Sequence, residues 1–212
     1  MTSTTVKAAA AAITSVTLEV PDPAAASEFY RAFGLGAQVR LRASEAPTSG
    51  FRGFTLSLIV SQPSTVDALV GTALDVGATT IKPVKKSLWG YGGSLRAPDG
   101  TIWKVASSSK KDTGPATRKI DDIVLLLGSE EVGASKQFYV ERGLEVKRSM
   151  GRRYAEFDTP EAPVKLGLYT RKALAKDAGV PPEGTGSHRI TIHSDAGPFT
   201  DPDGFAWEAT PR

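Results

Sequence analysis

The stretch Ser15–Val39 reads SVTLEVPDPAAASEFYRAFGLGAQV, and a related stretch, DIVLLLGSEEVGASKQFYVERGLEV, occupies residues 122–146. Each begins with an apolar strand-like run, continues through a helical run with Ala-Ser and then Phe-Tyr, and ends at Gly-Leu. Further along, PDGTIWK at 98–104 is matched by PDGFAWE at 202–208. Two pairs of segments, in the same order and at nearly the same offset, indicate an internal duplication.

Local patterns predict the elements of each copy. Residues 14–20 alternate between apolar and polar side chains, which is typical of a strand. Asp22 and Pro23 suit the cap and the first position of a helix that runs to about Phe33. The first half is then expected to hold strands near 37–42 and 54–60, a helix at 63–76, and strands near 79–83, 92–97 and 101–106. The second half is expected to hold a strand at 121–127, a helix at 130–141, strands near 144–150, 153–158 and 164–170, a short helix at 171–178, a strand at 188–193 and a final hairpin across Asp203-Gly204.

Composition limits the chemistry of any site. The 212 residues contain no cysteine and two histidines, which excludes disulfides, thiolate zinc sites, iron–sulfur clusters and cysteine nucleophiles. The chain divides into a flexible N-terminus at 1–12, a first half at 13–106, a linker at 107–119 and a second half at 120–212. The linker, SSSKKDTGPATRK, is basic but has no aromatic residue, so a solvated linker is favoured over a nucleic-acid surface.

The sequence gives few indications of partners. No apolar run approaches the ~20 residues that span a bilayer, and the N-terminus is not a convincing secretory signal. We therefore expect a cytoplasmic protein, a monomer or homodimer, whose partner is a small molecule rather than nucleic acid or a membrane.

The repeated order of elements resembles the vicinal oxygen chelate superfamily, the fold of glyoxalase, bleomycin-resistance and extradiol-dioxygenase proteins. The resemblance covers roughly residues 13–106 and 120–210. It implies an α+β fold in which tandem βαβββ modules form curved mixed sheets, with two pseudo-repeated halves. Enzymes of this superfamily hold a divalent metal with side chains from the first and last strands of paired modules.

Carried onto this chain, the family's ligand positions are mostly lost in the first half. The first-strand ligand falls on Ser15, and the closing-strand glutamate falls on Lys104, whose ammonium group does not suit a cation site. Lys104 is then a residue at the edge of a cavity or on the surface, or a partner for an acidic ligand. The family's remaining ligand, usually a glutamate, would lie in the second half near Gly167 or Leu168, and neither side chain can coordinate a metal.

The second half keeps one possible metal set, formed by Asp122, His188 and Glu208, with Glu208 also the candidate catalytic residue. Such a set would take Mn, Fe, Zn or Mg. His193 is five residues from His188, so the two imidazoles point to opposite faces of a regular strand. Simpler roles stay open: Asp122 caps a strand, His188 is exposed or bonds a backbone carbonyl, and Glu208 pairs with Arg189.

Aromatic residues near strand ends are the candidate cavity lining. The segment at 88–93, LWGYGG, combines glycines with two large rings, which suits a cover over a cavity, although both rings could instead belong to a hairpin core. Trp103 and Trp207 recur in the two closing hairpins and are expected in the core. The predicted ligand-binding residues are Phe54, Trp89, Tyr91, Tyr154 and Tyr169, with Phe51 nearby.

These observations support a first hypothesis and leave alternatives. The first is a protein that binds a small aromatic or amphipathic molecule in a sheet-lined cavity, with no cofactor and no metal catalysis. The alternative is a metal-dependent lyase, isomerase or dioxygenase with a single site in the second half. A third is a structural or interaction protein whose cavities are filled by side chains.

Overall fold

The structure is a computed structural model, and it describes residues 11–159 and 161–211. Most of the predicted flexible N-terminus, residues 1–10, lies outside the described part. Within that part, none of the helices is both long and apolar enough to cross a bilayer.

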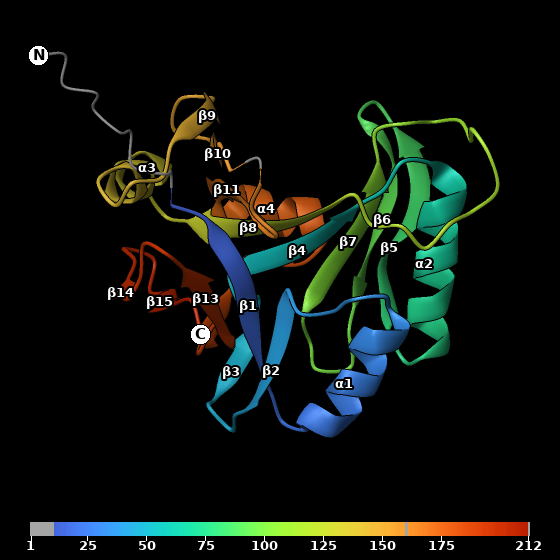
Figure 1. The fold of residues 1–212 in the computed structure, drawn as a ribbon, viewed down its shortest axis with the longest axis horizontal. Coiled ribbons are helices and arrows are strands. Elements are labelled where there is room, and N and C mark those ends of the chain that lie inside the picture. Colours follow the sequence, from blue (N-terminus) through green and yellow to red (C-terminus); the bar gives the residue numbers. More distant parts are fainter. Residues whose placement is uncertain (1–10, 160, 212) are drawn as a thin grey trace, which may run out of the picture.

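Two large sheets form the framework (Figure 1). The five-stranded sheet runs in the order β14 (Phe199–Thr200), β15 (Ala206–Ala209), β13 (Ile190–Ser194), β1 (Ile13–Val20) and β2 (Val39–Ala43). The eight-stranded sheet runs in the order β5 (Thr79–Ser87), β6 (Gly90–Arg96), β7 (Ile102–Ser107), β4 (Phe54–Ile59), β8 (Asp122–Ser129), β11 (Lys165–Thr170), β10 (Tyr154–Phe157) and β9 (Val146–Ser149). A small ribbon pairs β3 (Thr48–Gly50) with β12 (Gly184–Gly186).

Each large sheet combines strands from both halves of the chain. In the five-stranded sheet, β1 pairs antiparallel with β13, with Thr17 opposite Thr191. In the eight-stranded sheet, β4 pairs antiparallel with β8, with Leu56 opposite Leu125. The chain thus contains four modules: the first and fourth, whose strands at 13–43 and 190–209 share one sheet, and the complete second and third, at 54–107 and 122–170, which share the other. The two repeated halves are therefore interleaved in space.

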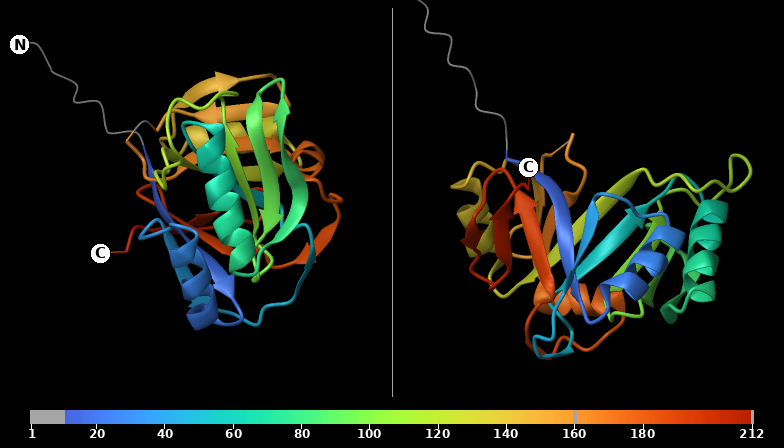
Figure 2. Two further views of the ribbon diagram at one scale, coloured as in Figure 1. Left: turned by 90° about the vertical axis from the view of Figure 1, so that its right-hand side faces the viewer. Right: turned by 60° about the horizontal axis from the view of Figure 1, so that its bottom comes forward.

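The first two helices begin at a side-chain cap or a proline. The Asp22 carboxylate accepts hydrogen bonds from the backbone N–H groups of Ala24 and Ala25, which starts α1 (Pro23–Ala32). Proline also opens α2 (Pro63–Asp75), which packs against β5, β6 and β7 (Figure 2). The third helix, α3 (Val132–Val140), lies against β10 and β11.

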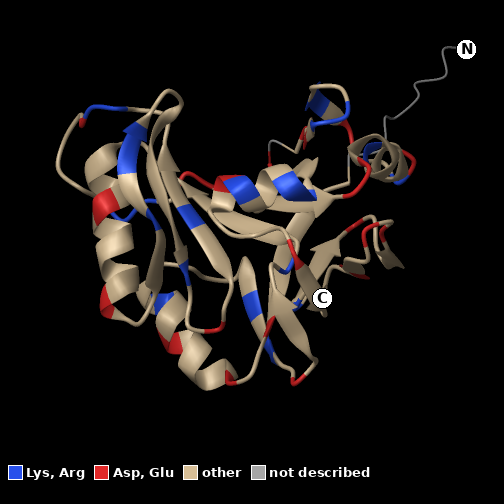
Figure 3. Ribbon diagram, turned by 180° about the vertical axis from the view of Figure 1, so that it is seen from behind, with Lys and Arg blue, Asp and Glu red and all other residues tan. Residues whose placement is uncertain are grey.

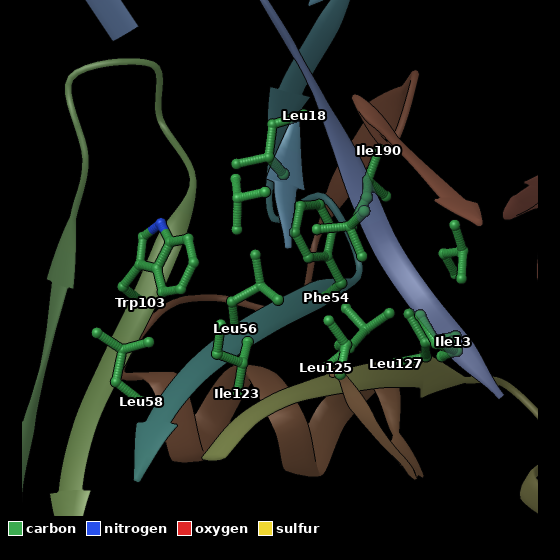
Figure 4. Close-up of a cluster of buried hydrophobic side chains, with 14 of the residues drawn as sticks. Ile13, Leu18, Phe54, Leu56, Leu58, Trp103, Ile123, Leu125, Leu127 and Ile190 are labelled. Atoms are coloured by element: carbon green, nitrogen blue, oxygen red, sulfur yellow. The ribbon is translucent and has the colours of Figure 1, made fainter. Parts of the chain in front are cut away.

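The main core lies between the two large sheets. Figure 4 shows Leu18 and Ile190 of the five-stranded sheet facing Leu56 and Leu125 of the eight-stranded sheet. Alternation along each strand sends these side chains inward, and the neighbouring residues of each strand point to the opposite face of its sheet. Trp103 and Trp207 are buried as predicted, at 0% and 2% exposure.

The segment Leu88–Gly93, which the sequence suggested as a cover over a cavity, forms the turn between β5 and β6 and the start of β6. β5 continues to Ser87, past the predicted end at 83, and pairs with β6, so Leu88 and Trp89 form the tip of a hairpin. Pro83 and the lysines of β5 lie in an edge strand, where proline and lysine are tolerated. Gly90 has φ +140°, and a Cβ there would lie 2.1 Å from the Ser107 carbonyl oxygen, so the turn requires glycine.

The basic linker is exposed over residues 110–119 and is hydrogen-bonded to the start of α2. The buried Gln62 side chain accepts a hydrogen bond from the Thr113 backbone N–H, at 2.8 Å. The same side chain donates to the carbonyl oxygens of Gly114 and Pro115. The linker therefore follows a fixed path over the start of α2.

Candidate functional site

A row of polar side chains crosses the face of the eight-stranded sheet that points away from the core. Lys104 of β7 lies opposite Ser94 of β6 and Ser57 of β4 in the strand register. Ser57 is opposite Val124, which in turn is opposite Lys165. The structure thus places Lys104 near the middle of this sheet face, with a side chain that is 23% exposed.

The fourth helix, α4 (Arg171–Ala178), lies across the same face. Figure 3 shows it in front of the eight-stranded sheet when the molecule is seen from behind. The Thr170 hydroxyl caps its start, and Gly179 ends it in the left-handed conformation. Leu174, Ala175 and Ala178 are fully buried against a cluster that includes Phe51. We call this side of the sheet the α4 face.

Polar contacts fix both ends of α4. At the start, the Arg171 guanidinium donates to the carbonyl oxygens of Phe51 and Pro182, at 2.6 and 2.9 Å. At the end, Lys82 Nζ donates to the carbonyl oxygens of residues 176 and 177, both at 2.7 Å. The Ser94 hydroxyl donates to the carbonyl oxygen of Ala178 at 2.7 Å. Asp177 forms an ion pair with Lys104.

A cleft of about 250 Å³ opens beside the C-terminal end of α4. Strands β5, β6 and β7 line it together with Asp177, and Trp89 stands at its edge with 86% of its surface exposed. Its charged and aromatic lining residues are Lys82, Lys85, Trp89, Tyr91, Lys104 and Asp177.

The predicted aromatic lining residues do not meet in one cavity. Trp89 and Tyr91 both border the cleft, although the Tyr91 hydroxyl donates to Asp67 of α2 at 2.9 Å. Tyr154 and Tyr169 pack on each other, with ring centroids 4.7 Å apart, on the strands at the other end of the α4 face. Phe54 is 2% exposed in the core between the sheets and does not border this cleft. Its position at a strand start did not reveal which face it would occupy.

The outer face of the five-stranded sheet carries a second polar cluster. The Thr17 hydroxyl lies 2.7 Å from Nε2 of His193, and Nδ1 of His193 is 3.9 Å from the Glu208 carboxylate. Arg42 joins Glu208, at 3.4 Å, to Glu19, at 2.7 Å. The residues of the cluster come from four adjacent strands, β2, β1, β13 and β15, and the pairing of these strands brings them together.

Burial sets the electrostatics of this cluster. Desolvation lowers the pKa of the His193 imidazole, and the negative charge of Glu208 opposes this effect. The hydrogen bond to Glu19 raises the pKa of Arg42. His193 Nδ1 is buried and lacks a hydrogen-bond partner among the described residues. The cluster is therefore an imidazole whose protonation is disfavoured by burial, beside a carboxylate that shares Arg42 with Glu19.

The three predicted metal ligands are not brought together. Asp122 begins β8 in the eight-stranded sheet and binds Lys165 Nζ at 2.6 Å, whereas Glu208 lies in the other sheet. His188 precedes β13, and its ring stacks on Phe205. Its two ring nitrogens lie 2.6 and 3.1 Å from backbone carbonyl oxygens, so the atoms a metal would need are already engaged.

No group of three or more histidine, aspartate or glutamate side chains in residues 11–159 and 161–211 has a geometry suited to a metal ion. The sequence places all three residues in one half but does not show which sheet each strand joins. At the carried-over positions of the first half, Ser15 lies opposite His193 and Lys104 faces Asp177. These residues do not fit the divalent metal that the resemblance implies.

Sequence reasoning missed Asp177, Arg42 and the pairing of Thr17 with His193. Asp177 belongs to the correctly predicted short helix, but nothing local showed that this helix would cross the sheet. The alternation along 190–194 does place His193 on the polar face of its strand. The motif Gly186-Ser187-His188 points to the other imidazole, so the alternation that marks His193 was not used.

The comparisons with known proteins concern the fold. No family model matches the sequence, and no curated protein matches it. Glyoxalase I from Zea mays matches with a TM-score of 0.60 at 12% identity, over 93% of this chain and 91% of that one. A mutant of the same enzyme matches with a TM-score of 0.60 at 14% identity, with the same coverage. A putative dioxygenase from Bacillus subtilis matches with a TM-score of 0.54 at 11% identity, over 86% of this chain and 69% of that one.

These likenesses span nearly the whole chain at low identity, so what they establish is the fold. The α+β architecture with two repeated halves, predicted from the resemblance to the vicinal oxygen chelate superfamily, is confirmed. A shared fold does not fix an activity.

Proposed function

We propose that this protein binds a small aromatic or amphipathic molecule in the cleft beside α4, without a metal-dependent step. The observation that carries the proposal is the position of Trp89, a large ring left 86% exposed at the edge of a cleft of about 250 Å³. An exposed tryptophan at a hairpin tip is unfavourable in water, and stacking on an aromatic ligand would remove that cost.

The cleft combines features common to small-molecule sites. Its floor is the glycine-rich strand β6, which leaves backbone surface accessible between the larger side chains of β5 and β7. A few charged groups, among them Lys85 and Lys104, stand beside this surface. Pockets for drug-sized ligands commonly enclose roughly 300–1,000 Å³, so this cleft suits a molecule at or below the small end of that range.

The alternative of a metal-dependent lyase, isomerase or dioxygenase has less support. Relatives by fold include an enzyme called glyoxalase I and a putative dioxygenase. In this chain, however, Glu208 is paired with Arg42 and Asp122 is paired with Lys165. A cation would have to displace both partners and would still lack a converging third ligand.

Ligand binding is tested with Trp89→Ser and, as a matched control, Leu88→Ser. Leu88 is the neighbouring residue of the same turn, is 80% exposed and does not line the cleft. A panel of small aromatic compounds is titrated by calorimetry against the wild type and both variants. We expect compounds that bind the wild type and the Leu88 variant equally and bind Trp89→Ser about tenfold more weakly. Equal loss in both variants, or no binding by any compound, would overturn the proposal.

A separate experiment addresses the metal. The purified chain is loaded with Mn, Fe, Zn or Mg in turn, dialysed and assayed for metal content, alongside Glu208→Ala. We expect no stoichiometric metal in either protein. One equivalent of metal retained by the wild type and lost by Glu208→Ala would contradict the proposal and favour the enzymatic alternative.

A further inference from the structure

We propose that the ligand of the cleft is an aromatic anion, whose negative group pairs with Lys85 and Lys104 in exchange for Asp177. This inference rests on the proposed function and adds the chemical class of the ligand. It follows from the charges that face the cleft and from how each of them is already engaged.

Positive charge exceeds negative charge around the cleft. Three lysines, at 82, 85 and 104, line it, and Asp177 is the only acid among the described lining residues. Lys82 is already committed, because its ammonium group donates to the carbonyl oxygens of Lys176 and Asp177 at the end of α4. It neutralises the negative end of the helix dipole. The cleft therefore holds two further lysines and a single carboxylate, which pairs with Lys104 alone.

Lys85 is the unpaired member of this set. It lies opposite Gly92 in the register of β5 and β6, on the side of the hairpin that faces the cleft. Within the described part of the chain its ammonium group forms no hydrogen bond or ion pair. Lys86, the next residue, lies opposite Tyr91 and does not line the cleft. A ligand anion in the cleft would give Lys85 its first partner.

Lys104 differs because its charge is partly shielded from water. Its side chain is 23% exposed, and its register neighbours Ser57 and Ser94 are uncharged. A partly buried ammonium group needs a counter-ion, and Asp177 supplies it. The Asp177 side chain is 46% exposed, so it can turn into water while the buried side of α4 stays in place. A ligand carboxylate or sulfonate could then replace it without leaving Lys104 unpaired.

The position of Trp89 indicates that the ligand also carries an aromatic ring. Its exposed ring at the cleft edge offers a stacking surface beside Lys85. One flat hydrophobic surface next to two cations recognises a molecule with an aromatic ring and an acidic group. A neutral aromatic compound would use the ring alone.

Two fluorescent probes that share their rings and differ in charge test this inference. Anilinonaphthalene sulfonate is anionic, and phenylnaphthylamine is its neutral counterpart. We expect the wild type to bind the anionic probe about tenfold more tightly, as one charge-assisted contact allows. Lys85→Gln should weaken the anionic probe about threefold, as expected for an exposed charge, while the matched control Lys86→Gln leaves it unchanged. Asp177→Asn should strengthen the anionic probe and leave the neutral one unchanged.

The outcomes separate this inference from the proposed function. If the neutral probe binds as tightly as the anionic one, or Lys85→Gln behaves like Lys86→Gln, or Asp177→Asn does not strengthen the anionic probe, the anionic class is wrong. Loss of the neutral probe in Trp89→Ser would still support binding in the cleft. If neither probe binds, or if binding of both is unaffected by Trp89→Ser, the proposed function fails and the anionic class fails with it.

Discussion

Lys104 of β7 and Asp177 of α4 form an ion pair although they lie 73 positions apart in the chain. The pair joins the second module to a helix of the second half and stands in the wall of the cleft. It therefore connects the position of α4 with the charge of the candidate site.

The strength of this pair should be modest. With 23% and 46% of the two side chains exposed, water screens their attraction. A double-mutant cycle with Lys104→Met and Asp177→Asn, followed by urea unfolding, should give a coupling energy below about 1 kcal/mol. A coupling above about 3 kcal/mol would show that the pair is too strong to be exchanged for a ligand.

The apolar side of α4 should hold the helix in place. Leu174 is fully buried on the α4 face, so Leu174→Ala should lower the free energy of unfolding by about 2–4 kcal/mol. Lys172→Ala, on the exposed side of the same helix, should change it by less than about 0.5 kcal/mol. Similar values for both variants would mean that α4 does not depend on its packing against the sheet.

The close approach of α4 to β8 should require glycine at position 128. A Cβ there would lie 2.9 Å from the carbonyl oxygen of Gly53 and 3.0 Å from Cα of Arg171, and backbone atoms cannot simply move aside. Gly128→Ala should therefore cost about 1–3 kcal/mol in urea unfolding.

Gly133 in α3 is the control for that substitution, because an added Cβ there meets nothing within 4 Å. Gly133→Ala should be neutral or stabilise by up to about 1 kcal/mol, since alanine favours a helix over glycine. A neutral Gly128→Ala would contradict the tight contact between α4 and β8.

Acid should destabilise the protein through His193. Burial lowers the pKa of its imidazole below the usual 6.5, so between these two values the unfolded chain binds more protons than the folded one. This contribution to stability is complete above pH 6.5 and is lost as the pH falls below it.

Urea unfolding of the wild type and His193→Gln at pH ~7.5 and ~5.5 measures this effect. The wild type should lose more stability between the two pH values than the variant, because titrating groups common to both proteins cancel in the comparison. An identical loss in both would show that His193 titrates as it does in the unfolded chain.

Much of the fold could be predicted from local signals. Asp22 and Pro23 marked the start of α1, and the short helix at 171–178 coincides with α4. The ribbon of β3 and β12 was missed because its glycine-rich strands have no apolar alternation and pair only with each other. Strand pairing across the chain is decided by tertiary packing, which a single sequence does not display.

The site was predicted less completely for the same reason. Trp89 stood out because its segment combines a large ring with glycines, and it does border the cleft. Asp122 and Glu208 were grouped because the resemblance places both at ligand positions of the second half, but the modules interleave and place them in different sheets. Asp177 gave no signal, since its importance comes only from the path of α4 across the sheet.

The central claim, a ligand site beside Trp89, is tested most directly by the indole N–H resonances of the three tryptophans in a titration with anilinonaphthalene sulfonate. Trp103 and Trp207 are buried and act as internal references. We expect the Trp89 resonance, assigned with Trp89→Ser, to shift on binding while the resonances of Trp103 and Trp207 stay in place. A probe that binds without moving the Trp89 resonance would contradict it.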